Sequence, residues 1–497
     1  MNTERNPWLA LSALIIGFFM IVLDMTIVAV ANPVILEHLH ADISQVIWVT
    51  SAYLLAFAVP LLVSGRLGDR FGPKNLYLVG LTVFTAASLW CGLSHTIGML
   101  IAARAAQGLG AALLTPQTMA VITRIFPQDK RGAAMGVWGA AAAFANLVGP
   151  LLGGVLVDGL GWQWIFIVNV PVGLIAFVLA ARFVPSLPTH KHKFDVPGVV
   201  LSGVGMFMLV FGVQEGHSRN WDAWIWTMIV SGLVVLAIFV VNQARNSGQP
   251  LLPLSLFRDR NFALADLAIA SVGAAVAAMM VPFYFYLQGV QGLSPTRSAL
   301  VAAPMAVVTL VCAPVLGKLG DRIHPRIVPT LGFGLFIISV GWFAMLMTPN
   351  SSIAEFLLVS AIFGVANAGV WAPLAATATH NLPLHQAGAG AGVYNAIRQV
   401  GSVLGSAAVG AVVASRLSAH GLGGGAAEGG SGPLVVPEPL RDAFSSALRE
   451  SMYLPIMVLV IGLIASALLI RIPRGGDAAE KEASTSPSAA EPLPSTR

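Results

Sequence analysis

Residues 65–74 read Gly-Arg-Leu-Gly-Asp-Arg-Phe-Gly-Pro-Lys, a short polar stretch between two long apolar runs. A related stretch, Gly-Lys-Leu-Gly-Asp-Arg-Ile-His-Pro-Arg, stands at residues 317–326, which is 252 positions further along the chain. The glycine, leucine, aspartate, arginine, proline and basic positions recur in register, and the second stretch also lies between apolar runs. Two matching polar joints in an otherwise apolar chain indicate a duplicated membrane protein.

The composition excludes an ordinary soluble protein. Of the 497 residues, 56% are hydrophobic and 10% are charged, and the mean hydropathy is +0.80, whereas soluble domains carry about 25% charged residues. Because a bilayer is spanned by roughly 20 apolar residues in a helix, we expect fourteen spans at about 8–30, 46–64, 76–94, 98–118, 134–157, 163–182, 196–214, 223–243, 262–287, 298–317, 327–347, 353–375, 388–413 and 452–471. The sequence lacks the alternation typical of barrel strands, so it predicts an all-α integral membrane protein.

Basic residues predict the orientation of these spans. With the N-terminus inside, twenty of the 27 Lys and Arg residues lie in inner segments and five lie in outer segments. Such a bias is typical of cytoplasmic loops, so we expect both termini in the cytoplasm. The net charge of +5 then marks one face of a membrane, and no nucleic-acid partner is expected.

The repeat and the span count together predict the domain organisation. The polar joints follow spans 2 and 10, so two parallel six-helix bundles are related by an axis along the membrane normal, with spans 7 and 8 inserted between them. We expect a mobile outer loop over residues 417–437 and a short surface helix over residues 441–452. The predicted units are residues 1–185 for the first bundle, 186–250 for the inserted pair, 251–473 for the second bundle and 474–497 for a disordered cytoplasmic tail.

Two charged residues of opposite sign are expected at the same depth in the membrane. Asp24 and Arg104 each lie about six residues from the outer end of a span, which is about 9 Å at 1.5 Å per residue. Because a charge in hydrocarbon costs a few kcal/mol or more, we expect them to pair. Burial disfavours the charged carboxylate and a guanidinium favours it, so Asp24 is a candidate for exchanging a proton for a cationic substrate. The alternative is a static ion pair that locks two helices.

Further ionisable residues lie in the second half of the chain. Arg398 falls near the middle of span 13, with Asn395 and Gln399 beside it on the helix. Either a role in a central cavity or bonding between helices explains these residues. Asp266 lies in the first turns of span 9, where the helix dipole favours a carboxylate, and we interpret it as structural.

Small residues gather in one span of each half. In span 5 they allow close helix approach, and a proline there can kink the helix: Gly149, Pro150, Gly153 and Gly154. Span 13 has a similar surface at Gly401, Gly405 and Gly410. These seams suit two bundles that rock on each other, although plain packing explains each of them equally well.

The two polar joints have candidate roles of their own. Glycines such as Gly65 and Gly68 allow a tight turn between helices. Carboxylate and guanidinium neighbours either latch one conformation through charge-assisted bonds or simply anchor the topology: Asp69 with Arg70, and Asp321 with Arg322.

Motifs for cofactors are missing from the sequence. There is no G-x-x-x-x-G-K-[ST] phosphate loop, the ten histidines are scattered, and Cys91 and Cys312 lie in separate apolar runs. Such cysteines are typical of small buried hydrophobes rather than of a disulfide framework or a metal site. We therefore expect neither a cofactor nor enzymatic activity.

Several of these motifs resemble those of a known family. The stretch at residues 65–74 resembles the loop signature of the major facilitator superfamily, Leu100-x-x-x-Arg104-x-x-Gln107-Gly108-x-Gly110 resembles its span 4 motif, and Gly149-Pro150-x-x-Gly153-Gly154 resembles its antiport motif. Two further stretches resemble fourteen-span drug:proton antiporters of the EmrB/QacA type: Leu23-Asp24-x-Thr26-x-Val28-x-Val30-Ala31-x-Pro33 and Trp164-x-Phe166-x-x-Asn169-x-Pro171-x-Gly173. The resemblance covers about residues 8–472, and it departs from the family pattern at Asn32, Ala145 and His324.

This resemblance implies roles for individual residues. Asp24 would contribute to the substrate and proton region, and Arg104, with Gln107 of the same motif, would assist proton coupling. The glycine–proline pair at residues 149 and 150 would shape a helix that favours exchange over uptake. Asp69 and Arg70 would gate the inner side.

From the sequence we expect a proton-driven exporter in a bacterial inner membrane that works by alternating access and functions as a monomer. Its partners would be lipophilic, cationic drugs or dyes, protons and membrane lipids. An exporter of an endogenous metabolite, lipid or siderophore is the alternative within transport. A membrane scaffold or sensor that transports nothing is a different class, and dye efflux that a protonophore abolishes would separate transport from it.

Overall fold

The structure is a computed structural model that describes residues 7–189, 195–216, 219–246, 250–380, 384–422 and 436–470. Within those ranges the chain is helical and no strand is present. The expected tail over 474–497 and most of the expected outer loop over 417–437 lie outside the described residues.

Helices in the first part of the chain correspond to the first six expected spans. They are α1 (Pro7–His38), α2 (Ile43–Phe71), α3 (Pro73–Gly92), α4 (Ile97–Ile125), α5 (Gln128–Leu160), α6 (Trp164–Ile167) and α7 (Asn169–Phe183). The inserted pair is α8 (Val196–Glu215) and α9 (Ala223–Arg245). The sixth span, expected as one helix, is interrupted at Val168 between α6 and α7.

The second part repeats this arrangement. Its elements are η1 (Leu254–Arg258), α10 (Arg260–Phe285), η2 (Tyr286–Val290), α11 (Pro295–Arg322), α12 (Ile327–Leu346), α13 (Ile353–His380), α14 (Leu384–Ala419), α15 (Glu438–Ser451) and α16 (Tyr453–Ala467). Thirteen helices of the described chain are long and apolar enough to cross a membrane, and α5 adds a shorter apolar stretch over Phe144–Leu160. The short helix expected before the last span is present as α15.

Side chains just before several helices explain where these helices begin. The backbone N–H of Gln45 donates to Asp42 Oδ1 at 2.8 Å, and the Asp42 N–H donates to Gln45 Oε1 at 3.1 Å, which forms a capping box at the start of α2. Asp222 and Asp259 cap α9 and α10, and Ser294 caps α11.

Helix packing confirms the internal duplication. In the first half α1 packs on α5 and α7, α2 packs on α4, and α3 packs on α4 and α7; in the second half α10 packs on α14 and α16, α11 packs on α13, and α12 packs on α13 and α16. The two halves then meet reciprocally, through α2 against α14 and α5 against α11. Each pair joins the second helix of one half to the fifth helix of the other. This is the pattern that a two-fold axis between parallel repeats produces.

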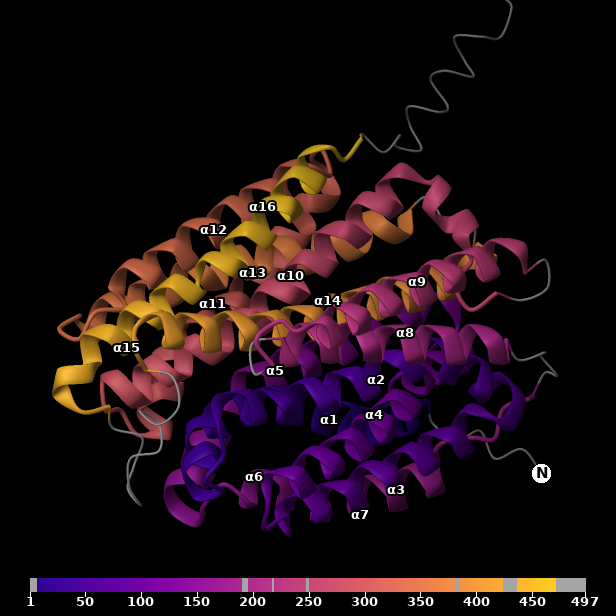
Figure 1. Cartoon of the computed structure of the whole chain (residues 1–497). Helices are drawn as coiled ribbons and strands as arrows, with labels where there is room; N and C mark the ends of the chain where they lie inside the picture. The colour runs from indigo at the N-terminus through magenta and orange to yellow at the C-terminus, as the bar shows by residue number, and fades with distance from the viewer. Residues whose placement is uncertain are drawn as a thin grey trace, which may run out of the picture.

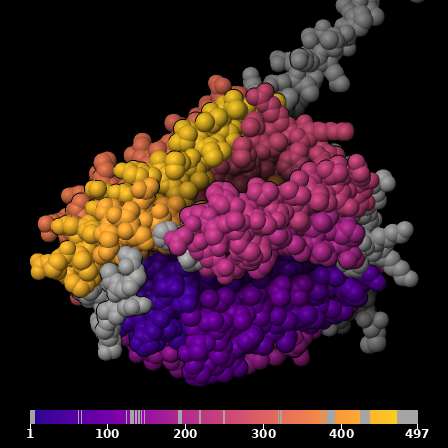
Figure 2. Space-filling model, in the orientation of Figure 1, coloured from indigo at the N-terminus to yellow at the C-terminus, as the bar shows by residue number. Residues whose placement is uncertain are grey.

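The inserted pair lies beside the seam between the halves. Helices α8 and α9 pack on each other, and α8 also packs on both α2 and α14 (Figure 1). In the space-filling view the magenta α9 region lies between the two halves, and the surface is hollowed between it and the yellow α16 (Figure 2). The hairpin therefore covers the contact between α2 and α14 that joins the halves.

The first polar joint differs in detail from the prediction. Helix α2 continues through Gly65 and Gly68 to Phe71, and the turn into α3 is made by Gly72, whose φ of +90° suits glycine. A Cβ at Gly68 would overlap the side-chain amide of Gln117 on α4, so Gly68 serves close packing rather than a turn. The tight turn expected at this joint is therefore made by Gly72, and the gating role predicted for Gly65 and Gly68 stays a prediction.

The charged partners of the joints are described only in part. Arg70 is exposed, with its guanidinium 5.4 Å from the ring of Phe71. The side chains of Asp69, Asp321 and Arg322 lie outside the described part of the structure. The gating role of these residues stays a prediction.

Candidate functional site

Two helices of the first half bring opposite charges together inside the protein. Asp24 on α1 and Arg104 on α4 form an ion pair, with Nη1 of the arginine 2.5 Å from Oδ2 of the aspartate. Their side chains are 0% and 1% exposed. The pairing expected from their equal depth is present, and it is direct rather than through water.

Neutral polar side chains complete the hydrogen bonding of this pair. Gln107, one turn after Arg104, donates from Nε2 to Asp24 Oδ1 at 2.8 Å and accepts from Arg104 Nη1 at 2.6 Å. Asn169 of α7 donates to the same Asp24 oxygen at 3.1 Å. The hydroxyl of Ser88 on α3 accepts from both amides at 3.0 Å and donates to the Phe166 carbonyl at 3.1 Å. Four helices therefore contribute to one buried network.

An aromatic and backbone lining surrounds the guanidinium of Arg104. Its Cζ lies 4.1 Å from the ring centroid of Tyr53 and 5.7 Å from that of Phe166. Its Nε donates to the Val49 carbonyl at 3.2 Å. A cation over an aromatic face that is shielded from water is stabilised by about 2 kcal/mol, so Arg104 is held in place even apart from Asp24.

This network, referred to below as the Asp24 network, consists of Asp24, Ser88, Arg104, Gln107 and Asn169. Both carboxylate oxygens accept hydrogen bonds and the whole group is buried. Removing one partner of a buried ion pair costs about 3–5 kcal/mol. Another conformation that separates α1 from α4 would therefore have to offset a cost of this order with new partners for both groups.

Asn169, Ser88 and Tyr53 were not predicted as members of the site. Asn169 belongs to the motif around Pro171 that resembles the drug:proton antiporters, and a polar residue within a span was a usable signal. Ser88 and Tyr53 carry no such signal, because serine and tyrosine within apolar helices are common. Only the packing of α2, α3 and α7 around Arg104 brings them in.

The second half has a different polar arrangement. Arg398 of α14 lies 5.6 Å from the ring centroid of Trp371 on α13, and its buried Nε has no hydrogen-bond partner among the described residues. The Trp371 indole donates to Asn367, whose amide donates to Thr309 Oγ1 of α11 at 3.2 Å. The structure does not bring Arg398 to Asp24, so the two predicted groups form separate sites, one in each half. Asn395, half-buried on α14, is one turn from Arg398.

The glycines of span 5 lie where helices touch. A Cβ at Gly149 would overlap the Thr26 hydroxyl of α1, and one at Gly153 would lie 2.7 Å from Ile27 Cγ1. A Cβ at Gly154 would lie 2.6 Å from Thr296 Cα at the start of α11. Helix α5, which contains Pro150, is thus pressed both against α1, which carries Asp24, and against the other half.

Several hydrogen bonds between the halves lie toward one end of the molecule. We term this end the His38 end, because α1 ends there, and the opposite end the Pro7 end. Gln288 donates to the Val30 carbonyl at 2.9 Å, and the Thr296 N–H donates to Asp158 Oδ2 at 3.0 Å. The hydroxyls of Ser51 and Ser406 lie 2.9 Å apart between α2 and α14. These bonds hold the halves together on the His38 side of the Asp24 network.

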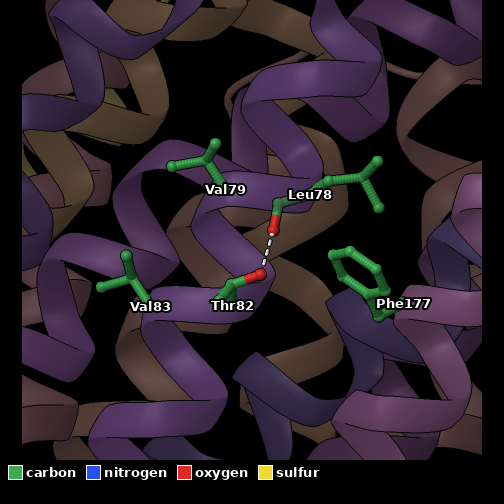
Figure 3. A pocket seen from close by; sticks show the side chains of 5 residues that line it. All are labelled: Leu78, Val79, Thr82, Val83 and Phe177. Carbon is green, nitrogen blue, oxygen red and sulfur yellow. Dashed lines mark hydrogen bonds between the residues drawn. The ribbon is translucent and has the colours of Figure 1, made fainter.

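A groove on the surface of the first half has a lining that is almost entirely apolar. It is lined by Leu78, Val79, Thr82, Val83 and Phe177 of α3 and α7 (Figure 3). Its one hydroxyl, that of Thr82, donates to the Leu78 carbonyl of its own helix at 2.9 Å. This groove offers no charged group, and it is not a candidate for the coupling site.

Comparison with known proteins gives a consistent result. Residues 14–406 match the family described as Major Facilitator Superfamily. The chain is 54% identical to the Uncharacterized MFS-type transporter Rv1250 of Mycobacterium tuberculosis, over 94% of this chain and 81% of that protein. It is 33% identical to the Tetracenomycin C resistance and export protein of Streptomyces glaucescens, over 83% of this chain and 77% of that protein. It is 35% identical to the Multidrug resistance protein Stp of M. tuberculosis, over 84% and 78% of the two chains.

Solved structures agree on the fold. The crystal structure of a bacterial homologue of the human lysosomal transporter Spinster, in an inward-facing and unoccupied conformation, superimposes with a TM-score of 0.64. It covers 94% of this chain and 97% of that chain at 18% sequence identity.

Proposed function

The chain belongs to the major facilitator superfamily and is a membrane transporter rather than an enzyme, and on that premise we propose that it is a proton-coupled exporter of lipophilic compounds. The observation that carries the proposal is the Asp24 network, a buried and fully bonded carboxylate–guanidinium pair between two helices. Such a pair is costly in a membrane unless it is used or held tightly. Relatives whose names include drug resistance and export support the outward direction.

We propose an alternating-access mechanism in which the Asp24 network is the coupling element. In the arrangement described here Asp24 is ionised, since Arg104 supplies a counter-charge at 2.5 Å. When α1 and α4 separate, Asp24 loses that counter-charge and takes up a proton; when they close again, Arg104 displaces the proton. The movement is attributed to α5, whose glycines press on α1 and on α11 at the same time.

The orientation follows from the excess of basic residues, twenty against five, on the side of the Pro7 end. We propose that this end and both termini face the cytoplasm of a bacterial cell, with the chain in the inner membrane as a monomer. The His38 end, where the halves are bonded together, would then be the closed outer end. A fourteen-span antiporter of the EmrB/QacA type is the branch we infer, and the proton gradient would be its energy source.

For the cargo we propose lipophilic cations, because Asp24, once separated from Arg104, can bind either a proton or a positively charged compound. A second candidate is an endogenous metabolite, favoured by the relative named for the export of tetracenomycin C. A panel that contains cationic, neutral and anionic dyes separates the two.

The test is dye efflux from proteoliposomes with an imposed proton gradient. We expect efflux of ethidium that a protonophore abolishes and that Asp24→Asn reduces at least tenfold. Glu355→Gln, at an exposed position near the start of α13, is the matched control and retains wild-type efflux. Efflux by the wild type that ignores the protonophore, or full efflux by Asp24→Asn, would refute the proposal.

A further inference from the structure

A second carboxyl group is buried in the other half, with no partner. Asp266 of α10 is 2% exposed, and neither Oδ1 nor Oδ2 has a hydrogen-bond partner among the described residues. Asp24 is equally buried, yet it receives hydrogen bonds from Arg104, Gln107 and Asn169. Each half therefore holds one buried carboxyl group. Asp24 in the first half is hydrogen-bonded, whereas Asp266 in the second half has no hydrogen-bond partner among the described residues.

The helix dipole does not account for Asp266. The residue that caps α10 is Asp259, whose side chain accepts from the Phe262 N–H at 2.7 Å. Asp266 lies seven positions after that cap, and the favourable effect of a helix N-terminus falls off within the first turn. The helix dipole, which was the reason for a structural interpretation of Asp266, therefore does not explain this residue.

The surroundings of Asp266 follow from the packing of α10 on α14. A Cβ at Gly401 would overlap the Ala270 backbone, and one at Gly405 would overlap the Ala274 backbone, so the two helices run side by side in register. One turn toward the Pro7 end, the same register places Ile397 opposite Asp266, and Tyr394, one turn before Ile397 on α14, is close enough to interact electrostatically with the Asp266 carboxyl group. The buried Tyr394 hydroxyl also has no hydrogen-bond partner among the described residues.

Charged and titratable groups near Asp266 are few. Helix α14 contributes Tyr394 and Arg398, and the guanidinium of Arg398 is turned toward Trp371 and makes no ion pair with Asp266. Of the other helices that pack on α10, α1 contributes Asp24, which Arg104 already pairs. In the described part of α13 and in α16, the titratable side chains, Glu355 and Tyr453, lie at the His38 end.

A carboxylate in this position would lack both a counter-charge and hydrogen-bond donors. Moving such an ion from water into a protein interior costs several kcal/mol even after relaxation, and a buried group in that situation takes the neutral form instead. Asp266 therefore lacks the features that keep a buried carboxylate ionised. Arg398 and Trp371, by comparison, are both only partly buried.

We propose that Asp266 is the proton-binding site of the second half: it holds a proton in this conformation and releases it when the seam between α10 and α14 opens to water. The step breaks the carboxyl O–H bond, passes the proton to water and leaves a carboxylate, to which the nearby Tyr394 hydroxyl can donate after a side-chain rearrangement. This inference rests on the proposed function, because a transported proton gives the site its use.

The first test does not depend on transport. Infrared spectra of the purified protein at neutral pH should contain the carbonyl band of a protonated, buried carboxyl group. We expect Asp266→Asn to lose this band and Asp24→Asn and Glu355→Gln to retain it. A wild-type spectrum without the band, or an Asp266→Asn spectrum that keeps it, overturns the proposal.

The second test addresses coupling. In proteoliposomes we expect Asp266→Asn to reduce at least tenfold the ethidium efflux that an imposed proton gradient drives. Ethidium should still move down its own concentration gradient. Asp266→Glu, which keeps the ionisable group, should restore part of the gradient-driven efflux, and the size-exclusion profile of each variant checks folding. Gradient-driven efflux at the wild-type level in Asp266→Asn overturns the inference. If the wild type itself transports no dye, the proposed function fails and the infrared band still decides whether Asp266 is protonated.

Discussion

Replacing Asp24 by asparagine leaves a side chain of nearly the same shape but removes the counter-charge of Arg104. The guanidinium is 1% exposed and cannot lose its proton, so it stays buried as an uncompensated cation. Loss of one partner from a buried pair costs about 3–5 kcal/mol. The aromatic ring of Tyr53, 4.1 Å away, recovers only part of this energy.

The converse substitution, Arg104→Met, is expected to cost less. Without the guanidinium, Asp24 can take up a proton and become neutral, while Gln107 and Asn169 still donate to its Oδ1. The main loss is then the hydrogen bond from Arg104 to the amide oxygen of Gln107, about 1–3 kcal/mol for a buried acceptor, which keeps only the weak Cys91 thiol donor at 3.7 Å. The Val49 carbonyl lies inside α2 and still accepts from its own helix. The double variant removes both charges, and it should be more stable than Asp24→Asn alone.

The assay is thermal unfolding of the purified protein in detergent, followed by tryptophan fluorescence for the wild type, the two single variants and the double variant. Since 1 kcal/mol changes the Tm of a 150–250-residue domain by about 2–4 °C and that of a longer chain by less, we expect Asp24→Asn to lower Tm by several degrees. The diagnostic result is the order, with Asp24→Asn lowest and the double variant above it. Equal losses in the single variants that simply add in the double variant would refute the argument from the buried charge.

Two further predictions follow from the first half and its contact with the second. Asn169→Ala removes a hydrogen bond to Asp24 and should destabilise the protein by about 1–3 kcal/mol, measured as a lower Tm, whereas an unchanged Tm would show that this bond is dispensable. Gly154→Val should abolish dye efflux in a protein that remains monodisperse, because the new side chain meets the Thr296 backbone and keeps the His38 end from closing. Gly159→Val is its control and should transport normally, since a Cβ there has nothing within 4 Å; equal activity of both variants would contradict the role of the α5–α11 contact.

Much of the fold could be predicted because it depends on local properties. The length of an apolar run decides whether a helix can span a bilayer, and every predicted span has a helical counterpart. The repeat at residues 65–74 and 317–326 likewise predicted the duplicated packing that α2 with α4 and α11 with α13 display. Details that depend on a single backbone angle were not predictable in this way, such as the turn at Gly72.

For the candidate site, the sequence predicted only the depth of the residues within the membrane. The sequence by itself determined that Asp24 and Arg104 lie at one depth, because depth is counted in residues along each helix. It could not predict that the hydrogen bonding of Asp24 differs from that of Asp266, since both are carboxyl groups a few residues inside a span. Only the tertiary structure decided that, within the described part of the chain, one is surrounded by donors and the other by none. The physical reason is that hydrogen-bond satisfaction depends on which faces of neighbouring helices meet, and that lateral choice is made by packing rather than by the hydrophobic length of any one helix.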